Sequence, residues 1–86
     1  MRHAGTNALD SLEPLLQELR AVPGLVERSR GIFYRKSKSF LHFHEDPAGL
    51  FADVREVNGA DFRRIDVNET SGRQVLVKLA KSAASG

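Results

Sequence analysis

The chain has 86 residues, 41% of them hydrophobic and 28% charged, and a formal net charge of +2 at pH 7. These values are typical of one small globular domain and exclude a wholly disordered chain. The absence of cysteine excludes a disulfide scaffold, a thiolate zinc site and a cysteine nucleophile. No apolar run is long enough to span a membrane, and the small net charge does not indicate a class of partner.

The N-terminal residues are mostly small or polar and carry no signal-peptide pattern. We therefore expect a flexible tail over residues 1–10, one domain over 11–84 and a cytoplasmic location. The domain begins with leucines at i, i+3, i+4 and i+7, which predict a helix over 11–21. These leucines are Leu12, Leu15, Leu16 and Leu19. Val22-Pro23-Gly24 ends the predicted helix, since the residue before proline avoids helical backbone angles.

From Gly31 onward the hydrophobic pattern has a period of two, which predicts β-strands. The strongest turn signal is Asp46-Pro47-Ala48-Gly49, which has the residue types of a type I turn. Lys36-Ser37-Lys38 and Asn58-Gly59 are two further turn candidates. The expected strands are residues 32–35, 39–44, 50–55 and, with a weaker pattern, 62–67.

The last expected element is a helix with capping-box spacing at Ser71 to Gln74. Its apolar face comprises Val75, Leu76, Leu79, Ala80 and Ala83. Strands grouped between two helices indicate an α+β fold rather than an α/β fold. We expect a three- to four-stranded antiparallel meander with both helices packed on one face of the sheet.

The hairpin closed by residues 46–49 has a predictable register. Phe43 faces Ala52 and Leu41 faces Val54, so these four residues form the inward, apolar face. On the outer face His44 pairs with Phe51, His42 with Asp53, and Phe40 with Arg55. Because the outer face combines aromatic, imidazole, carboxylate and guanidinium groups, we expect any ligand or partner to bind there.

His42 and His44 form an H-x-H pair, which places both imidazoles on one face of a strand. Asp53 offers a third metal ligand, but the alternative is a structural hydrogen bond from His42 to Asp53. Short motifs are weak evidence, so the structural interpretation is favoured and no tight metal site is expected. His42 and Asp53 also lack a nucleophile for a hydrolytic triad, and no nucleotide-binding motif is present. We expect no catalytic residues and no cofactor.

Residues 28–38 contain five cationic and no anionic side chains. Such a segment binds phosphate groups in nucleic-acid-binding proteins, and aromatic residues nearby can stack on bases. A solvated turn beside an edge strand has the same composition, and that interpretation is favoured. The basic residues are Arg28, Arg30, Arg35, Lys36 and Lys38.

The run 38–55, preceded by Val22-Pro23-Gly24-Leu25-Val26-Glu27-Arg28, resembles a known family. It is similar to small bacterial proteins of the luciferase-like domain family, which pair a Pro-Gly-x-x-Glu-Arg entry with a Phe-x-His-x-His-x-Asp strand. The resemblance covers residues 12–82, implies no reaction, and carries over His42, His44 and Asp46 as motif positions. The order of elements more distantly resembles the MmcQ/YjbR-like proteins.

The sequence thus predicts a non-enzymatic module that binds a small ligand or a protein through its outer sheet face. A homodimer is the expected use of that face, since two aromatic residues there form an apolar patch that one symmetric contact covers. A nucleic-acid-binding module using residues 28–38 is one alternative. A histidine-based metal-binding protein is the other.

Overall fold

The structure, a computed structural model, describes residues 2–56 and 61–85. In this part of the chain, helices and strands follow one another as two short N-terminal elements, a helix, five strands and a long final helix. They are β1 (Arg2–His3), α1 (Thr6–Ser11), α2 (Glu13–Arg20), β2 (Leu25–Ser29), β3 (Ile32–Arg35), β4 (Lys38–Asp46), β5 (Gly49–Arg55), β6 (Phe62–Asp66) and α3 (Thr70–Ala84).

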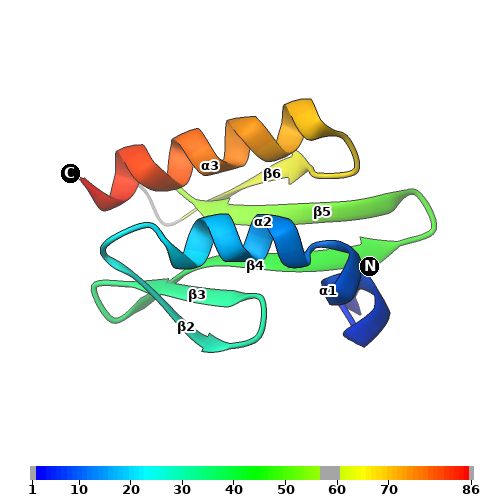
Figure 1. The fold of residues 1–86 in the computed structure, drawn as a ribbon, viewed down its shortest axis with the longest axis horizontal. Helices are drawn as coiled ribbons and strands as arrows, with labels where there is room; N and C mark the ends of the chain where they lie inside the picture. The colour runs from blue at the N-terminus through cyan, green and yellow to red at the C-terminus, as the bar shows by residue number, and fades with distance from the viewer. Residues whose placement is uncertain (1, 57–60, 86) are drawn as a thin grey trace.

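The strands form one antiparallel sheet in the order β2-β3-β4-β5-β6. The short strand β1 pairs with the C-terminal end of β4. Helices α2 and α3 lie side by side over the same face of this sheet (Figure 1). The predicted α+β class is confirmed, and the described residues form six strands and three helices in place of three or four strands and two helices. None of the helices in the described residues is long and apolar enough to cross a membrane.

The N-terminal residues differ from the expected tail. Arg2 and His3 pair with Glu45 and His44 of β4, and α1 follows from Thr6. The predicted helix over 11–21 is also divided, because α1 ends at Ser11 and α2 begins at Glu13. Pro14 explains the break: its ring has no N–H to donate and collides with a carbonyl one turn earlier.

Strand β2 was missed by the hydrophobic pattern because its alternation is the reverse of that of an ordinary surface strand. Val26 is 57% exposed, whereas the charged Glu27 is half-buried. The Glu27 carboxylate accepts hydrogen bonds from Arg20 of α2 and from the backbone N–H of Gly31. The inner face of β2 is thus attached to α2 by the ion pair between Glu27 and Arg20, at a position where an amphipathic strand normally has an apolar residue.

The two predicted hairpins at the centre of the sheet are confirmed. Lys36 and Ser37 form the tight turn between β3 and β4 with positive φ angles of 52° and 67°. The next turn is closed by Asp46, whose Oδ1 accepts the backbone N–H of Ala48 at 2.7 Å. The register of β4 with β5 is as expected from residue 41 to residue 46. The predicted Asn58-Gly59 turn lies outside the described residues.

The core lies between the sheet and the two long helices, as the faces of the hairpin predict. Leu41, Phe43, Ala52 and Val54 are at most 4% exposed. Helices α2 and α3, together with Leu12 between α1 and α2, contribute the rest of the same cluster: Leu12, Leu15, Leu16, Leu19, Leu76, Ala80 and Ala83. The predicted face of α3 is wrong at Val75, which is 43% exposed because it lies at the edge of the buried stripe.

Helix α3 begins at Thr70, earlier than the predicted capping box, and its first turn presses against the end of β6. A Cβ atom at Gly72 would lie 1.9 Å from the carbonyl oxygen of Asp66. Arg73 Nε donates to the carbonyl oxygen of Val67 at 2.8 Å. This close approach, which only glycine permits, fixes where α3 starts.

Candidate metal site on the outer sheet face

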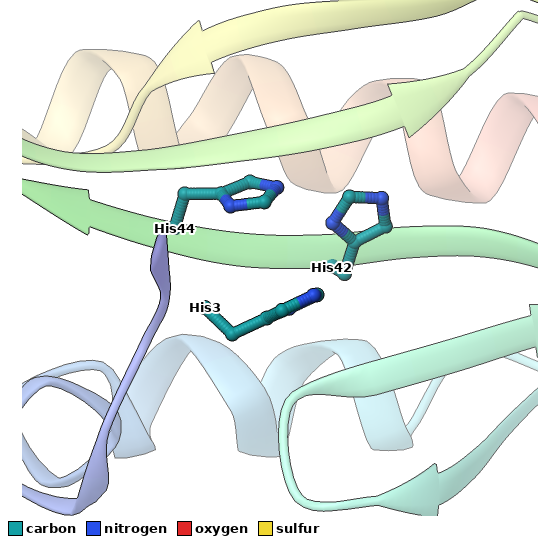
Figure 2. A group of neighbouring side chains, drawn as sticks. All are labelled: His3, His42 and His44. Atoms are coloured by element: carbon teal, nitrogen blue, oxygen red, sulfur yellow. The ribbon is translucent and has the colours of Figure 1, made fainter. Parts of the chain in front are cut away.

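The outer face of the sheet, on the side away from α2 and α3, holds a cluster of three imidazoles. The side chains of His3, His42 and His44 approach one another there (Figure 2). Each offers a ring nitrogen, and these nitrogens lie within 4.8 Å of one another. We call these three residues the histidine cluster. The chain contains three histidines, so every one of them belongs to it.

Two strands place the histidine cluster. His42 and His44 alternate with inward-facing residues on β4, so their rings project from the same face. Their ring centroids are 4.8 Å apart. His3 arrives on β1, where it is the backbone partner of His44 and stacks on its ring at 5.0 Å.

Glu45 holds the N-terminal segment beside β4. One of its carboxylate oxygens accepts a hydrogen bond from Arg2 at 2.7 Å, and the other accepts the backbone N–H of Gly5 at 2.7 Å. The backbone N–H of Ala4 donates to the carbonyl oxygen of Phe43 at 3.1 Å. These contacts fix the segment on both sides of His3.

Asp53 supports the cluster from β5. It is 8% exposed, and its Oδ2 lies 3.1 Å from His44 Nε2. Arg64 of β6 donates to both oxygens of the same carboxylate, from Nε at 2.8 Å and from Nη2 at 2.9 Å. The expected pairing of His42 with Asp53 holds for the backbone register, but the imidazole that contacts the carboxylate is that of His44.

The contact with Asp53 favours Nδ1 as the nitrogen of His44 that binds a metal ion. An Nε2–H that points at the carboxylate leaves the lone pair on Nδ1. The Nδ1 atoms of His42 and His44 are both buried and have no hydrogen-bond partner among the described residues. Buried polar atoms nearly always have a partner, and a metal ion would supply one to both nitrogens. A carboxylate bonded to the second nitrogen of a ligating histidine is typical of zinc sites.

The spacing of the cluster suits a tetrahedral ion. Two nitrogens bound to zinc at about 2.0–2.1 Å lie roughly 3.3 Å apart. The nitrogens of the cluster, within 4.8 Å of one another, reach that separation through small rotations of the side chains. Three nitrogen ligands leave one position of a four-coordinate ion for another group.

The electrostatic environment favours the neutral form of the His42 imidazole. Partial burial lowers the pKa of His42, and the neighbouring His44 and His3 lower it further, whereas Asp53 opposes the change. Neutral imidazole is the form that binds metal. The hydrogen bonds from Arg64 lower the pKa of Asp53, which therefore stays ionised beside the cluster.

The structure corrects the predicted position of Phe40. It is 3% exposed and belongs to the core, not to the outer face. A β-bulge is the reason: Leu41 pairs with Phe33 but Ser39 pairs with Tyr34, so Phe40 is an extra residue on β4. The bulge turns Phe40 inward, and the expected pairing of Phe40 with Arg55 does not form.

The other two predicted outer-face residues flank the histidine cluster. Phe51 is half-buried and is the backbone partner of His44. The Nε of Arg55 donates to the carbonyl oxygen of Ser39 at 2.7 Å, next to the bulge. The guanidinium of Arg55 also lies over the ring of Phe62, 4.6 Å from its centroid.

The structure spreads the basic residues of 28–38 over the β2-β3-β4 end of the sheet. Arg30 is committed to ion pairs with Asp10 and Glu13 of the N-terminal helices. Arg28 lies 4.6 Å over the ring of Tyr34 on the outer face. The remaining members are Arg35, Lys36 and Lys38, and they lie at or beside the β3–β4 turn.

Asp53→Asn is expected to lower the free energy of unfolding by about 1–3 kcal/mol, because it weakens charge-assisted hydrogen bonds at a buried carboxylate. Asp10→Asn is the control, since it removes an exposed ion pair of little worth. The pKa of Asp53 lies below its ordinary 3.8, so its contribution is full above that pH and lost as the pH falls further. Urea denaturation across pH checks both statements; equal losses in the two variants would contradict them.

His3 and Arg64 are the two members of this site that the sequence did not reveal. His3 lies in a segment without hydrophobic periodicity, and β6 carries too weak a pattern to place Arg64 beside Asp53.

Comparison with protein-family models gives no match for the chain, and comparisons with curated proteins and with solved structures give none either. The resemblance to the luciferase-like domain family therefore stays a prediction, and the site is argued on its geometry.

Proposed function

We propose that the domain binds one divalent transition-metal ion of the zinc class through His3, His42 and His44. One observation carries the proposal: all the histidines of the chain meet at one place, although His3 is far from the other two in the sequence. The unpartnered Nδ1 atoms of His42 and His44 and the carboxylate behind His44 support it.

The sequence alone favoured a structural role for the H-x-H pair because two histidines and one carboxylate make an incomplete set of ligands. In the structure His3 joins the pair as a third imidazole, and three imidazoles are a sufficient protein ligand set for zinc. Imidazole ligands without thiolate suit zinc, cobalt, nickel and copper rather than calcium or magnesium. The proposal keeps the domain as a binding module of the outer sheet face and names the ion as its ligand.

The homodimer through the outer face stays a prediction. The apolar patch that would form its interface is smaller than expected, because Phe40 is in the core. The nucleic-acid alternative loses Arg30 to ion pairs with the helices. Neither has an observation equal to the convergence of the histidines.

The test is a titration of the metal-free, tag-free protein with Zn²⁺ by calorimetry and with Co²⁺ by visible absorption. We expect one ion per chain and a visible spectrum typical of four-coordinate Co²⁺. Each of His3→Ala, His42→Ala and His44→Ala is expected to weaken zinc binding about tenfold or more, since each removes a ligand.

Arg2→Gln is the matched control. It removes the ion pair of Arg2 with Glu45 next to His3 but leaves all three imidazoles. We expect its zinc affinity to stay close to that of the parent protein. Stoichiometric binding that survives the loss of His3, or no saturable binding at all, would contradict the proposal.

A further inference from the structure

We propose that the metal ion takes a small organic carboxylate as its fourth ligand, with Arg64 binding the carboxylate and Phe62 contacting its apolar part. The inference rests on the proposed function, because it requires an ion on the histidine cluster. It goes further by naming the class of ligand that the loaded site binds.

The first step concerns access to the ion. The cluster lies on the sheet face opposite to α2 and α3 (Figure 1). His3 is exposed, and His42 and His44 are half-buried. Three protein ligands are typical of zinc sites that keep a position open for water or substrate. A small molecule from solution therefore has a route to the fourth position.

The second step concerns charge. Neutral imidazoles add no negative charge, so a bound divalent ion keeps its two positive charges. Among the described residues, Asp53 is the only carboxylate that an ion pair or hydrogen bond links to the cluster. That carboxylate is already shared between His44 and Arg64. Asp46 also interacts electrostatically with Arg64. With the ion and Arg64 counted against Asp53 and Asp46, the loaded site keeps an excess of positive charge, which favours an anionic fourth ligand.

The third step concerns Arg64. Its guanidinium gives Nε and Nη2 to Asp53, and this places it one carboxylate away from His44. The Arg64 side chain is nevertheless 50% exposed, and its remaining nitrogen, Nη1, is not used by Asp53. A planar guanidinium held in this way is suited to a second carboxylate, since such groups match in geometry as well as charge.

The fourth step concerns Phe62, which gives the site an apolar wall. Its ring centroid is 5.2 Å from that of His42, and the residue is 37% exposed. Arg55 lies over the ring, so the part of Phe62 that remains exposed is what would contact the apolar part of a ligand whose carboxylate reaches the ion. This arrangement predicts that an aromatic carboxylate binds more tightly than acetate.

The experiment follows the visible spectrum of the Co²⁺-loaded protein during titration with acetate and with benzoate. We expect both anions to change the bands saturably, with benzoate binding more tightly than acetate. Arg64→Gln is expected to weaken both anions by about fivefold, which is the upper range for a solvent-exposed charge pair. Phe62→Ala is expected to remove the advantage of benzoate and leave acetate unchanged.

Arg63→Gln is the matched control for Arg64, since Arg63 lines a hollow on the helix side with Leu79 and Ala83. Its anion affinities should equal those of the parent protein. Cobalt that binds without any response to either anion would overturn this inference and leave the metal site standing. Failure of cobalt to bind would overturn the proposed function itself. Equal weakening by Arg63→Gln and Arg64→Gln would show non-specific charge attraction and would also overturn the inference.

Discussion

Phe43→Ala is expected to destabilise the domain by about 3–5 kcal/mol, the usual cost of truncating a buried phenylalanine. Phe43 is 2% exposed and lies at the centre of the inward face of β4. The substitution removes apolar burial and leaves a cavity that neighbouring strands cannot fill. A domain of this size has a total stability of about 4–13 kcal/mol, so this one change removes a large part of it.

Urea denaturation measures this effect, with Phe62→Ala as the control because Phe62 is the same residue type on the exposed face. The control is expected to cost clearly less, about 1–2 kcal/mol, because it gives up only partial burial and the contact with Arg55. Where Phe43→Ala does not fold, Phe43→Leu still allows the measurement, with a smaller loss. Similar midpoints for the Phe43 and Phe62 variants would mean that the inward face is assigned wrongly.

Zinc is expected to raise the melting temperature by about 10–20 °C when the free ion is at 100 times its dissociation constant. Binding to the folded state alone adds about 2.7 kcal/mol under that condition, and each kcal/mol is worth several degrees in a domain of this size. His3 and the histidines of β4 come together only in the folded chain, so the unfolded chain offers no equivalent site. At the same zinc concentration His3→Ala should reduce the shift to about half or less, since a tenfold weaker site adds about 1.4 kcal/mol. The metal-free melting temperature should stay nearly unchanged, because His3 is exposed.

The zinc effect has a predictable pH dependence. Metal binding requires neutral imidazole, so the shift should be large at about pH 7.5 and small at about pH 5.5. The pKa of His42 is lowered from 6.5 by burial and by the other histidines. The metal-free protein therefore also loses stability as the pH falls below 6.5, because the unfolded chain takes up the proton more readily. A zinc shift that is the same at both pH values would contradict ligation by histidine.

The central hairpin could be predicted because two independent signals agree there. The turn at residues 46–49 fixes the register, and the alternation from Leu41 to Val54 fixes which face is buried. Phe40 shows the limit of that argument. A β-bulge inserts one residue without any change in the turn or in the alternation nearer to it, so its position cannot be read from the pattern.

Only part of the candidate site, the pair His42 and His44, could be predicted from the sequence. The H-x-H spacing places His42 and His44 together because alternation along a strand is a local property. His3 joins them through pairing of β1 with β4, which depends on contacts between distant segments, such as those of Arg2 and Gly5 with Glu45. Neither contact leaves a periodic signal in the sequence. The sequence accordingly suggested two ligands and a hydrogen bond, whereas the fold brings together three imidazoles.

Strand β4 carries both the core and the histidine cluster, on alternate residues. A slip of one residue against β5 would turn Leu41 and Phe43 to the solvent and His42 and His44 into the core. The cost of exposing the two apolar side chains therefore also holds the two imidazoles in place. The β-bulge at Phe40 lies outside the stretch that carries both sets of residues. An insertion or deletion between residues 41 and 46 is therefore expected to disrupt the core and the cluster together, whereas a substitution at a half-exposed histidine is expected to leave the core in place. Substitutions can therefore alter the chemistry of the outer face, whereas insertions or deletions in this part of β4 would disrupt the fold as well.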